Sequence, residues 1–254
     1  MAQILNVYAL PTLVAPEDLG EGTVVVIDVL RATTTIIHAL EAGAGEVIPC
    51  LEVEQARKTA AVLPEGLAVL GGERGGLKID GFDLGNSPED YTPETVGGKT
   101  VVFTTTNGTR AMQRCNKARQ VLIGAFVNAE SLCQKLAGVE TVHLLCAGTR
   151  GQMTTDDILV AGLIVQRLQQ RGDMQYALNA QAITARETWQ AAFALPHALG
   201  AEPLEAERLA AQLETTTGGQ DLIKIGLQRD ILVAANLDQF QSVPELDLET
   251  FRIH

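Results

Sequence analysis

Short apolar runs rich in β-branched residues alternate along the chain with amphipathic stretches of helical length. The apolar runs predict strands over residues 5–10, 24–27, 46–50, 67–70, 101–103, 120–124 and 142–145. The amphipathic stretches predict helices over residues 33–42, 53–63, 109–115, 128–137, 156–170, 175–193, 202–213 and 220–237. This alternation is typical of an α/β fold with mostly parallel or mixed sheets flanked by helices.

Three of the predicted strands end in a polar loop, rich in Thr or Gly, that leads into a helix-like segment. These loops occupy residues 28–35, 104–110 and 146–151. Such a unit places hydroxyls and free helix N-terminal N–H groups at the carboxyl end of a buried strand, where open α/β sheets bind ligands. Each loop also contains one Arg, and the three copies together indicate a site for a small, multiply anionic molecule.

The composition is that of an ordinary globular chain, and it narrows the range of partners. Of the 254 residues, 46% are hydrophobic, but the length alone does not separate one α/β unit over 1–254 from two small lobes. A net charge of −12 disfavours nucleic acid and anionic membranes as partners. We expect a cytoplasmic protein, because no secretory signal, membrane-spanning stretch or paired cysteine spacing is visible.

Asp28 directly follows the apolar strand 24–27, so its carboxylate is expected to project from the carboxyl edge of the sheet. Hard cations such as Mg²⁺ prefer carboxylate oxygens together with substrate phosphate and water. The alternative is that Asp28 only accepts N–H hydrogen bonds in the following turn. Because Arg31 and a triplet of threonines come next, we favour a metal-binding or catalytic role.

The loop 104–109 offers several hydroxyls, a side-chain amide and free N–H groups around one helix start. The residues concerned are Thr104, Thr105, Thr106 and Asn107. Oxyanions of phosphate or sulfonate are satisfied by such a nest. One Thr would explain a helix cap, but the full set exceeds that need. The loop therefore favours anion binding.

A long segment without clear periodicity, residues 71–98, contains Glu73 and Arg74 between two Gly pairs. Long irregular segments in compact domains are usually functional or disordered, and flanking glycines allow close approach of the backbone to a ligand. Glu73 is a candidate metal ligand and Arg74 a candidate for binding an anionic group. The alternative is that the pair forms a solvated hairpin tip.

Asp156 and Asp157 begin the helix predicted over 156–170, where acidic residues favourably oppose the helix dipole. Alternatively, one of these two carboxylates orients a metal-bound water, and Asp157 is the stronger candidate of the two.

Cys146 lies at a position where a nucleophile could act, but a small buried cysteine at a strand end is the better interpretation. The chain lacks paired His ligands and the motifs typical of zinc sites, acyl transfer, dinucleotide binding or ATP binding.

Taken together in order, these segments resemble one family. The matching pieces are Ile27 to Thr33, Gly72 to Arg74, Gly85 to Pro88, Thr104 to Thr109, Cys146 to Thr149, Asp157, Ala161, Gly162, Gly226 and Asp230. The sequence is similar to the Mg²⁺-dependent 2-phosphosulfolactate phosphatases known from coenzyme M biosynthesis. The resemblance covers nearly the whole chain, except the region of about 175–217. It implies two α/β lobes with a cleft, a bound Mg²⁺ and hydrolysis of a phosphate monoester.

The resemblance and the residues lead to one expected activity, the hydrolysis of (2R)-2-phospho-3-sulfolactate. Asp28, with Glu73 or Asp157, would hold Mg²⁺ as a Lewis acid. The expected catalytic residues are Asp28, Asp157 and Arg31. The expected substrate-binding residues are Arg74, Asn86, Ser87, Thr104, Thr105, Thr106, Asn107 and Gly148.

Two alternatives stay open: a phosphatase of another phosphorylated hydroxy acid or sulfonate, and a non-catalytic module that binds a small anionic metabolite. The residues do not decide whether water, a carboxylate or Cys146 attacks phosphorus. Closed dimers are the commonest protein assembly, so a homodimer is one expected arrangement.

Overall fold

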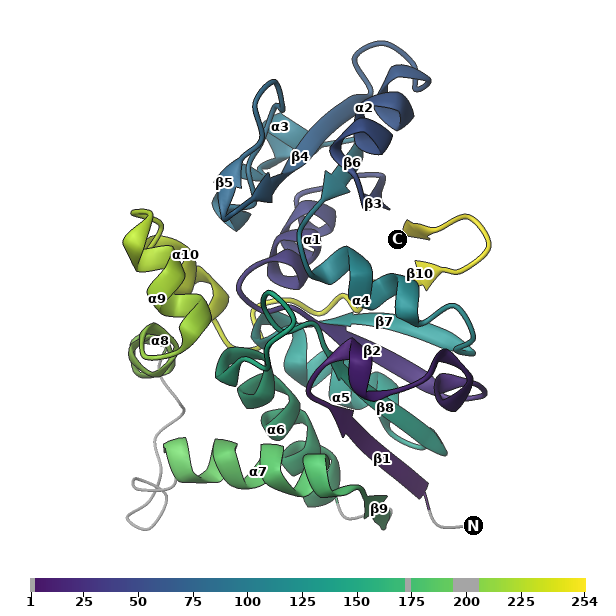
Figure 1. Cartoon of the computed structure of the whole chain (residues 1–254), viewed down its shortest axis with the longest axis vertical. Helices are drawn as coiled ribbons and strands as arrows, with labels where there is room; N and C mark the ends of the chain where they lie inside the picture. The colour runs from purple at the N-terminus through teal and green to yellow at the C-terminus, as the bar shows by residue number, and fades with distance from the viewer. Residues whose placement is uncertain (1–2, 172–174, 194–205) are drawn as a thin grey trace.

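The computed structural model describes residues 3–171, 175–193 and 206–254 and contains two β-sheets (Figure 1). In the first sheet the strand order is β7 (Gln120–Gly124), β2 (Thr23–Ile27), β8 (Thr141–Cys146), β1 (Gln3–Tyr8) and β9 (Tyr176–Leu178). All neighbouring strands of this sheet are parallel. The inner strand β2 is buried at every position, as expected for a parallel strand covered on both faces.

The second sheet is mixed. Its strand order is β10 (Leu246–Asp247), β11 (Arg252–Ile253), β3 (Glu46–Cys50), β6 (Thr100–Thr104), β4 (Ala68–Arg74) and β5 (Leu77–Lys78). The three inner strands β3, β6 and β4 are parallel, whereas β11 and β5 add antiparallel neighbours at either side. The carboxyl ends of β4 and β6 therefore lie next to each other, which matters for the site described below.

Helices cover both sheets and fill the space between them. The helices up to residue 193 are α1 (Ala32–Glu41), α2 (Val53–Ala61), α3 (Pro93–Val96), α4 (Gly108–Arg114), α5 (Ala129–Leu136), α6 (Thr155–Gln170) and α7 (Ala180–Phe193). Short 3₁₀ turns occur at η1 (Pro11–Leu13), η2 (Pro16–Leu19), η3 (Pro88–Asp90) and η4 (Phe126–Asn128). Figure 1 shows α1 and α4 between the sheets, and α2 packs on β3, β4 and β6.

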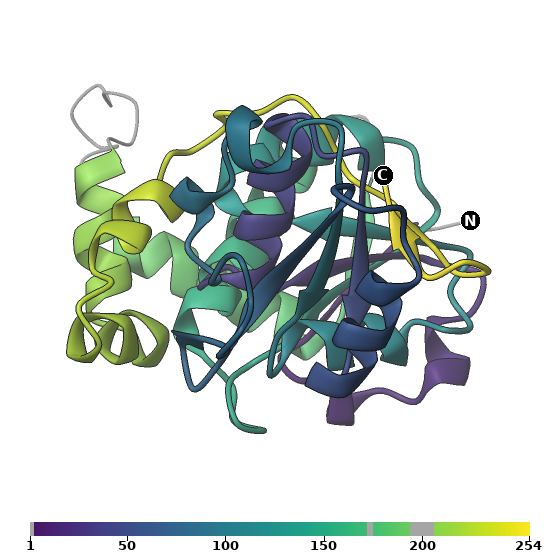
Figure 2. The ribbon, with the colours of Figure 1, turned by 90° about the horizontal axis from the view of Figure 1, so that it is seen from above.

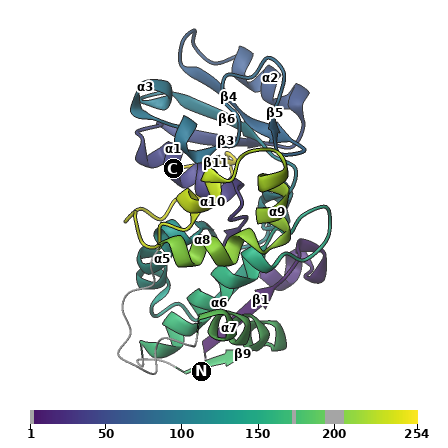
Figure 3. The same cartoon turned by 90° about the vertical axis from the view of Figure 1, so that its left-hand side faces the viewer.

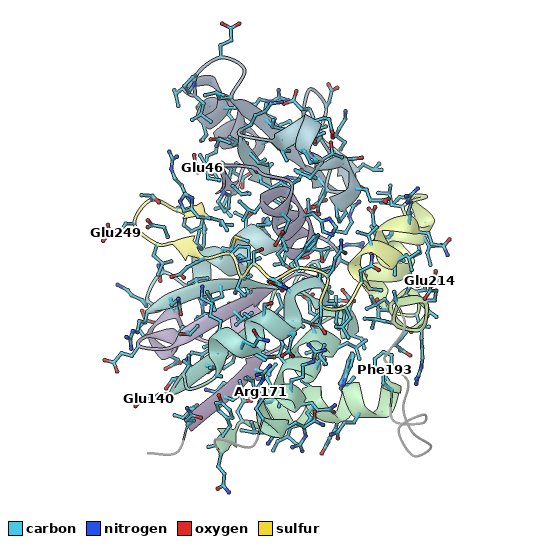
Figure 4. The ribbon with its side chains drawn as sticks, turned by 180° about the vertical axis from the view of Figure 1, so that it is seen from behind. Glu46, Glu140, Arg171, Phe193, Glu214 and Glu249 are labelled. Atoms are coloured by element: carbon cyan, nitrogen blue, oxygen red, sulfur yellow. The ribbon has the colours of Figure 1, made fainter. Side chains whose placement is uncertain are left out.

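Three further helices, α8 (Ala206–Glu214), α9 (Thr217–Lys224) and α10 (Arg229–Ala234), form a group at one side of the molecule (Figures 2 and 3). Phe193, labelled at the end of α7 in Figure 4, lies under the guanidinium of Arg208 from α8, 5.6 Å from ring centroid to Cζ. The helix α9 also contacts α6. These contacts hold the group against α6 and α7.

One large cluster of buried apolar side chains includes residues from both sheets, such as Val25 and Ile123 from the first and Val101 and Phe103 from the second. A smaller cluster around Phe82 lies on the other face of the second sheet, under α2. Among the described residues, no helix is long and apolar enough to cross a lipid bilayer.

The structure confirms the predicted α/β fold with mostly parallel or mixed sheets flanked by helices. The strands predicted over 46–50 and 120–124 have the observed bounds, and most helices differ from prediction by one or two residues. The predicted start of a helix at 202 falls outside the described residues.

Three predicted elements were wrong in part. The strand predicted over 67–70 continues to Arg74, because it pairs with β6 and β5. The segment predicted as one helix over 175–193 begins with β9, which pairs with the edge of β1. The helix predicted over 220–237 is divided into α9 and α10 at Gly226, whose φ of +77° a glycine adopts without steric cost.

Candidate active site

The three polar loops identified in the sequence meet at one cavity. It has a volume of about 280 Å³ and lies where the carboxyl ends of β2, β4, β6 and β8 face α9. Its lining residues are Asp28, Leu30, Arg31, Glu73, Gly75, Gly76, Asn86, Thr105, Thr106, Asn107, Thr149, Arg150, Gly218, Asp221, Leu222 and Ile225. Residues from both sheets thus surround one small cavity that contains polar and charged side chains.

Asp28 lies on the buried side of this cavity, immediately after β2, and is 8% exposed. The N–H of Asp28 donates to Oγ1 of Thr33 (3.1 Å), which fixes the backbone where the strand turns into α1. A Cβ on Gly108 would lie 2.9 Å from Oδ2 of Asp28, so the glycine leaves room for the carboxylate. The position of the Asp28 carboxylate therefore depends on the close approach of Gly108 at the start of α4.

The pKa of Asp28 is raised to about 7. Burial is the largest cause, and the nearby carboxylates of Glu73 and Asp156 follow. Backbone N–H groups of Ala32 and Gly108 lower the pKa but do not offset these effects. A buried, electrostatically crowded carboxylate of this kind is stabilised by a proton or a cation.

Glu73, at the end of β4, faces the same cavity from the second sheet. Its Oε1 accepts hydrogen bonds from the N–H (2.8 Å) and the hydroxyl (2.9 Å) of Thr106, and its Oε2 accepts one from the N–H of Gly76 (2.7 Å). The preceding Gly72 has a φ of +140°, and a Cβ there would lie 2.0 Å from the carbonyl oxygen of Thr104. The Gly-rich run thus lets β4 pass close to β6 and places Glu73 in the cavity.

Arg31 lines the cavity as part of a buried polar network. It follows a cis peptide bond with Leu30, and its side chain is 3% exposed. The guanidinium donates to Oδ2 of Asp230 and to the carbonyl oxygen of Gly76, both at 2.6 Å. Asp230 also accepts a hydrogen bond from the hydroxyl of Ser87 (2.6 Å). These hydrogen bonds join the loop after β2, the segment 71–98 and α10.

Asn86, Thr105 and Asn107 also lie on the cavity wall. The side-chain oxygen of Asn86 is buried without a hydrogen-bond partner among the described residues. The Thr105 hydroxyl is 3.5 Å from that of Thr109, and Oδ1 of Asn107 accepts a hydrogen bond from the N–H of Arg150 (3.2 Å). A buried polar atom without a partner is costly, so the Asn86 amide is well suited to contact a ligand.

Asp157 and Gly148 do not line the cavity. Oδ1 of Asp157 accepts a hydrogen bond from the N–H of Val29 (2.9 Å), and Oδ2 accepts one from the N–H of Gly148 (3.0 Å). Burial, and then Asp156 and Asp28, raise the pKa of Asp157 well above its ordinary value, whereas the two N–H groups lower it. In this arrangement Asp157 joins the loop after β2 to the loop after β8.

Arg74 and Thr104 also lie outside the cavity lining. The guanidinium of Arg74 donates to the carbonyl oxygens of Leu51 (2.7 Å) and Glu73 (2.8 Å) and to the hydroxyl of Thr104 (2.9 Å). These bonds tie the end of β4 to the ends of β3 and β6. The structure therefore places both side chains behind the site, where they hold its strands together.

Two further buried residues, Asp156 and Cys146, lie near the cavity without lining it. Asp156 is buried, its Oδ1 has no hydrogen-bond partner among the described residues, and a Cβ on Gly218 would lie 2.7 Å from its Oδ2. Cys146 is fully buried at the end of β8, and burial raises the pKa of its thiol well above the ordinary value. A thiol that stays protonated is a poor nucleophile, as expected for a small buried cysteine.

Several residues around the cavity were missed by the sequence analysis. Asp221 and Leu222 come from α9, which showed no motif in the sequence, and Ile225 directly follows this helix. Arg150 was noticed only as the Arg of its loop, and Asp230 only through the family resemblance. The signal that could have found Asp230 is chemical, because a buried Arg31 requires an acidic partner.

An α/β protein in which polar strand-end loops surround two buried carboxylates has the structure of an enzyme for small anionic metabolites. The sequence matches the family described as 2-phosphosulpholactate phosphatase over residues 8–249. It is 38% identical over 229 residues to a probable 2-phosphosulfolactate phosphatase of Symbiobacterium thermophilum, covering 90% of this chain and 92% of the relative. The chain belongs to the 2-phosphosulpholactate phosphatase family.

Two further relatives are also probable 2-phosphosulfolactate phosphatases. A probable 2-phosphosulfolactate phosphatase of Deinococcus radiodurans is 38% identical over 235 residues, covering 91% of this chain and 90% of the relative. Another from Caldanaerobacter subterraneus is 44% identical over 173 residues, covering 67% and 71%. Family and relatives together identify the chain as a phosphatase.

Proposed function

We propose that this phosphatase hydrolyses (2R)-2-phospho-3-sulfolactate to (2R)-3-sulfolactate and inorganic phosphate, and that it requires Mg²⁺. The bond between phosphorus and the C2 oxygen breaks, water supplies the oxygen that phosphorus gains, and the C2 oxygen receives a proton. The observation that carries the proposal is the pair of buried carboxylates, Asp28 and Glu73, on the wall of one small cavity.

The donor set is suited to magnesium. Among the described residues no group of three or more His, Cys, Asp or Glu is arranged to hold a metal ion. Mg²⁺ does not need such a group, because it is usually bound by one or two carboxylates together with substrate phosphate and water. Asp28 and Glu73 would hold it, and the ion would neutralise charge on the phosphoryl oxygens as a Lewis acid. Asp157 lies outside the cavity lining, and its two oxygens accept the N–H groups of Val29 and Gly148, so it supports the loops instead.

The other cavity residues supply donors for an anionic substrate. Thr105 and the amide of Asn86 face the cavity, and an amide can present either its oxygen or its N–H group to a ligand. Arg31 adds a positive charge that Asp230 holds in place. Fixed donors of this kind bind and orient a phosphate without reorganising during the reaction. These residues therefore position the phosphoryl group next to the two carboxylates.

The free state of the cysteines supports a proposal about the cellular compartment of the protein. All four are free and buried. We propose a reducing compartment such as the cytoplasm, where thiols stay reduced.

Phosphate release from purified protein tests the proposal. We expect release from (2R)-2-phospho-3-sulfolactate with added Mg²⁺, and at least a hundredfold slower release with excess chelator. A panel of other phosphorylated hydroxy acids should give lower kcat/KM values. A better substrate in that panel would overturn the substrate assignment, and full activity in chelator would overturn the role of Mg²⁺.

A further inference from the structure

In the described part of the chain, two arginines line the cavity, and they differ in exposure and in the partners of their guanidinium groups. Arg31 is 3% exposed, and its guanidinium is bound to Asp230 and Gly76. Arg150 is 74% exposed, and its guanidinium is paired with Asp221 across the cavity. The charge of Arg31 is therefore part of the protein scaffold, whereas that of Arg150 is held only by an exposed ion pair.

Asp221 has a second cation available within its own helix. Nζ of Lys224 lies 3.1 Å from Oδ1 of Asp221, while Arg150 contacts Oδ2. If Arg150 turned toward a ligand, Asp221 would keep a positive neighbour. Exposed ion pairs are weak in water, so exchanging one partner for an anionic ligand costs little.

The backbone of Arg150 is held by hydrogen bonds, whereas its exposed side chain is held by one ion pair. The N–H of Arg150 donates to Oδ1 of Asn107, and Thr149 and Gln152 exchange two backbone hydrogen bonds at 2.9 Å in the same turn. The Cα of Arg150 thus stays at the cavity mouth whichever partner the guanidinium contacts.

The burial of the carboxylates indicates which end of the substrate lies deeper in the cavity. Asp28 is 8% exposed, so the phosphate, which must reach Asp28 and Glu73, takes the inner end of the cavity. The carboxylate attached to C2 and the sulfonate on C3 then extend toward the mouth, where the exposed guanidinium of Arg150 lies. Guanidinium groups bind planar pairs of oxyanion oxygens in a bidentate manner, which suits a sulfonate as it suits a phosphate.

We propose that Arg150 determines specificity by leaving Asp221 and binding the sulfonate of the substrate. This inference rests on the proposed function, since it assumes a phosphorylated sulfonate as the substrate. It makes Arg150 the residue that distinguishes that substrate from phosphorylated hydroxy acids without a second strong anion.

The test compares two substrates in the wild type and in Arg150→Gln. One is (2R)-2-phospho-3-sulfolactate, and the other is 2-phospholactate with the same spatial arrangement at C2, in which hydrogen replaces the sulfonate. We expect Arg150→Gln to lower kcat/KM about 30-fold for the sulfonate, mainly through KM, and less than about threefold for 2-phospholactate. Equal losses for the two substrates would overturn the inference.

Two further variants separate ligand binding from a structural latch between the loop and α9. Asp221→Asn removes the competitor of the sulfonate, so kcat/KM for the sulfonate substrate should equal or exceed that of the wild type. A latch would instead make Asp221→Asn lose as much as Arg150→Gln. Arg110→Gln, on the exposed face of α4 and outside the cavity lining, removes the same charge and should leave the substrate ratio unchanged.

The two proposals fail in different ways. If the wild type hydrolyses 2-phospholactate as well as the sulfonate, the substrate assignment fails and Arg150 has no sulfonate to select. If the wild type prefers the sulfonate but Arg150→Gln keeps that preference, the function stands and the role of Arg150 is overturned. Thermal melting of each variant shows whether it is folded.

Discussion

The two arginine–aspartate pairs around the cavity make similar contacts in different surroundings. Arg31 and Asp230 have side chains that are 3% and 4% exposed, whereas Arg150 and Asp221 are 74% and 31% exposed. Desolvation makes the partner of a buried charge indispensable, while solvent screening makes the partner of an exposed charge exchangeable. The difference shows how one cavity can combine a rigid inner wall with a rim that responds to the ligand.

The largest expected effect concerns the buried carboxylate on the inner wall. Asp28→Asn keeps the size of the side chain but removes the charge that would hold Mg²⁺, so kcat should fall at least about 10³-fold in a phosphate-release assay. Asp80→Asn, an exposed residue outside the cavity, is the matched control and should behave as the wild type. Activity of Asp28→Asn within tenfold of the wild type would show that the inner wall does not carry the chemistry.

The same substitution should stabilise the metal-free protein above neutral pH. The pKa of Asp28 is raised from 3.8 to about 7 by burial, Glu73 and Asp156, so the folded state favours the neutral acid. Stability from this group is fully present below pH 3.8 and is lost as the pH rises to about 7.

We therefore expect Asp28→Asn to raise the free energy of unfolding by up to about 4 kcal/mol at pH 8 in chelator, and by nothing near pH 4. Thermal melting at the two pH values measures the difference. A variant that is less stable than the wild type at pH 8 would mean that Asp28 is not electrostatically strained in the folded protein.

The comparison of the two pairs itself predicts an unequal cost of breaking them. Asp230→Asn leaves Arg31 buried without its counter-charge and should lower the free energy of unfolding by about 3 kcal/mol. Asp221→Asn breaks an exposed pair and should change it by less than about 1 kcal/mol. Urea denaturation of both variants measures the contrast, and equal costs would remove the distinction between inner wall and rim.

The smallest expected effect concerns a buried residue next to the chemistry. Cys146→Ala removes a fully buried sulfur whose raised pKa keeps it protonated. Because a protonated thiol does not attack phosphorus, kcat should stay within about threefold of the wild type. A loss comparable to that of Asp28→Asn would make Cys146 the nucleophile.

The sequence predicted those parts of the fold and the site that depend on local pattern. Apolar runs gave the inner strands, and polar residues directly after them gave Asp28 and the Thr105 loop, because the carboxyl ends of strands meet at one sheet edge. Short edge strands were missed, since two-residue strands such as β10 exist only through their pairing.

The sequence could not predict the direction in which individual side chains point. Asp156 and Asp157 are adjacent, yet only the structure shows that both oxygens of Asp157 are occupied by backbone N–H groups while Asp156 keeps one oxygen without a partner among the described residues. Arg74 had the residue type and spacing for anion binding, but its guanidinium bonds to carbonyl oxygens behind the cavity. The contribution of α9 arises from tertiary packing, which no local motif encodes.

The most direct test of the account is the position of a bound divalent cation in crystals of the wild type grown with Mn²⁺ in place of Mg²⁺. Anomalous scattering locates Mn²⁺ without ambiguity from water. The account predicts one strong peak bonded to the carboxylates of Asp28 and Glu73 inside the cavity. A peak on Asp157 instead, or a cavity without a peak in crystals of active enzyme, would contradict it.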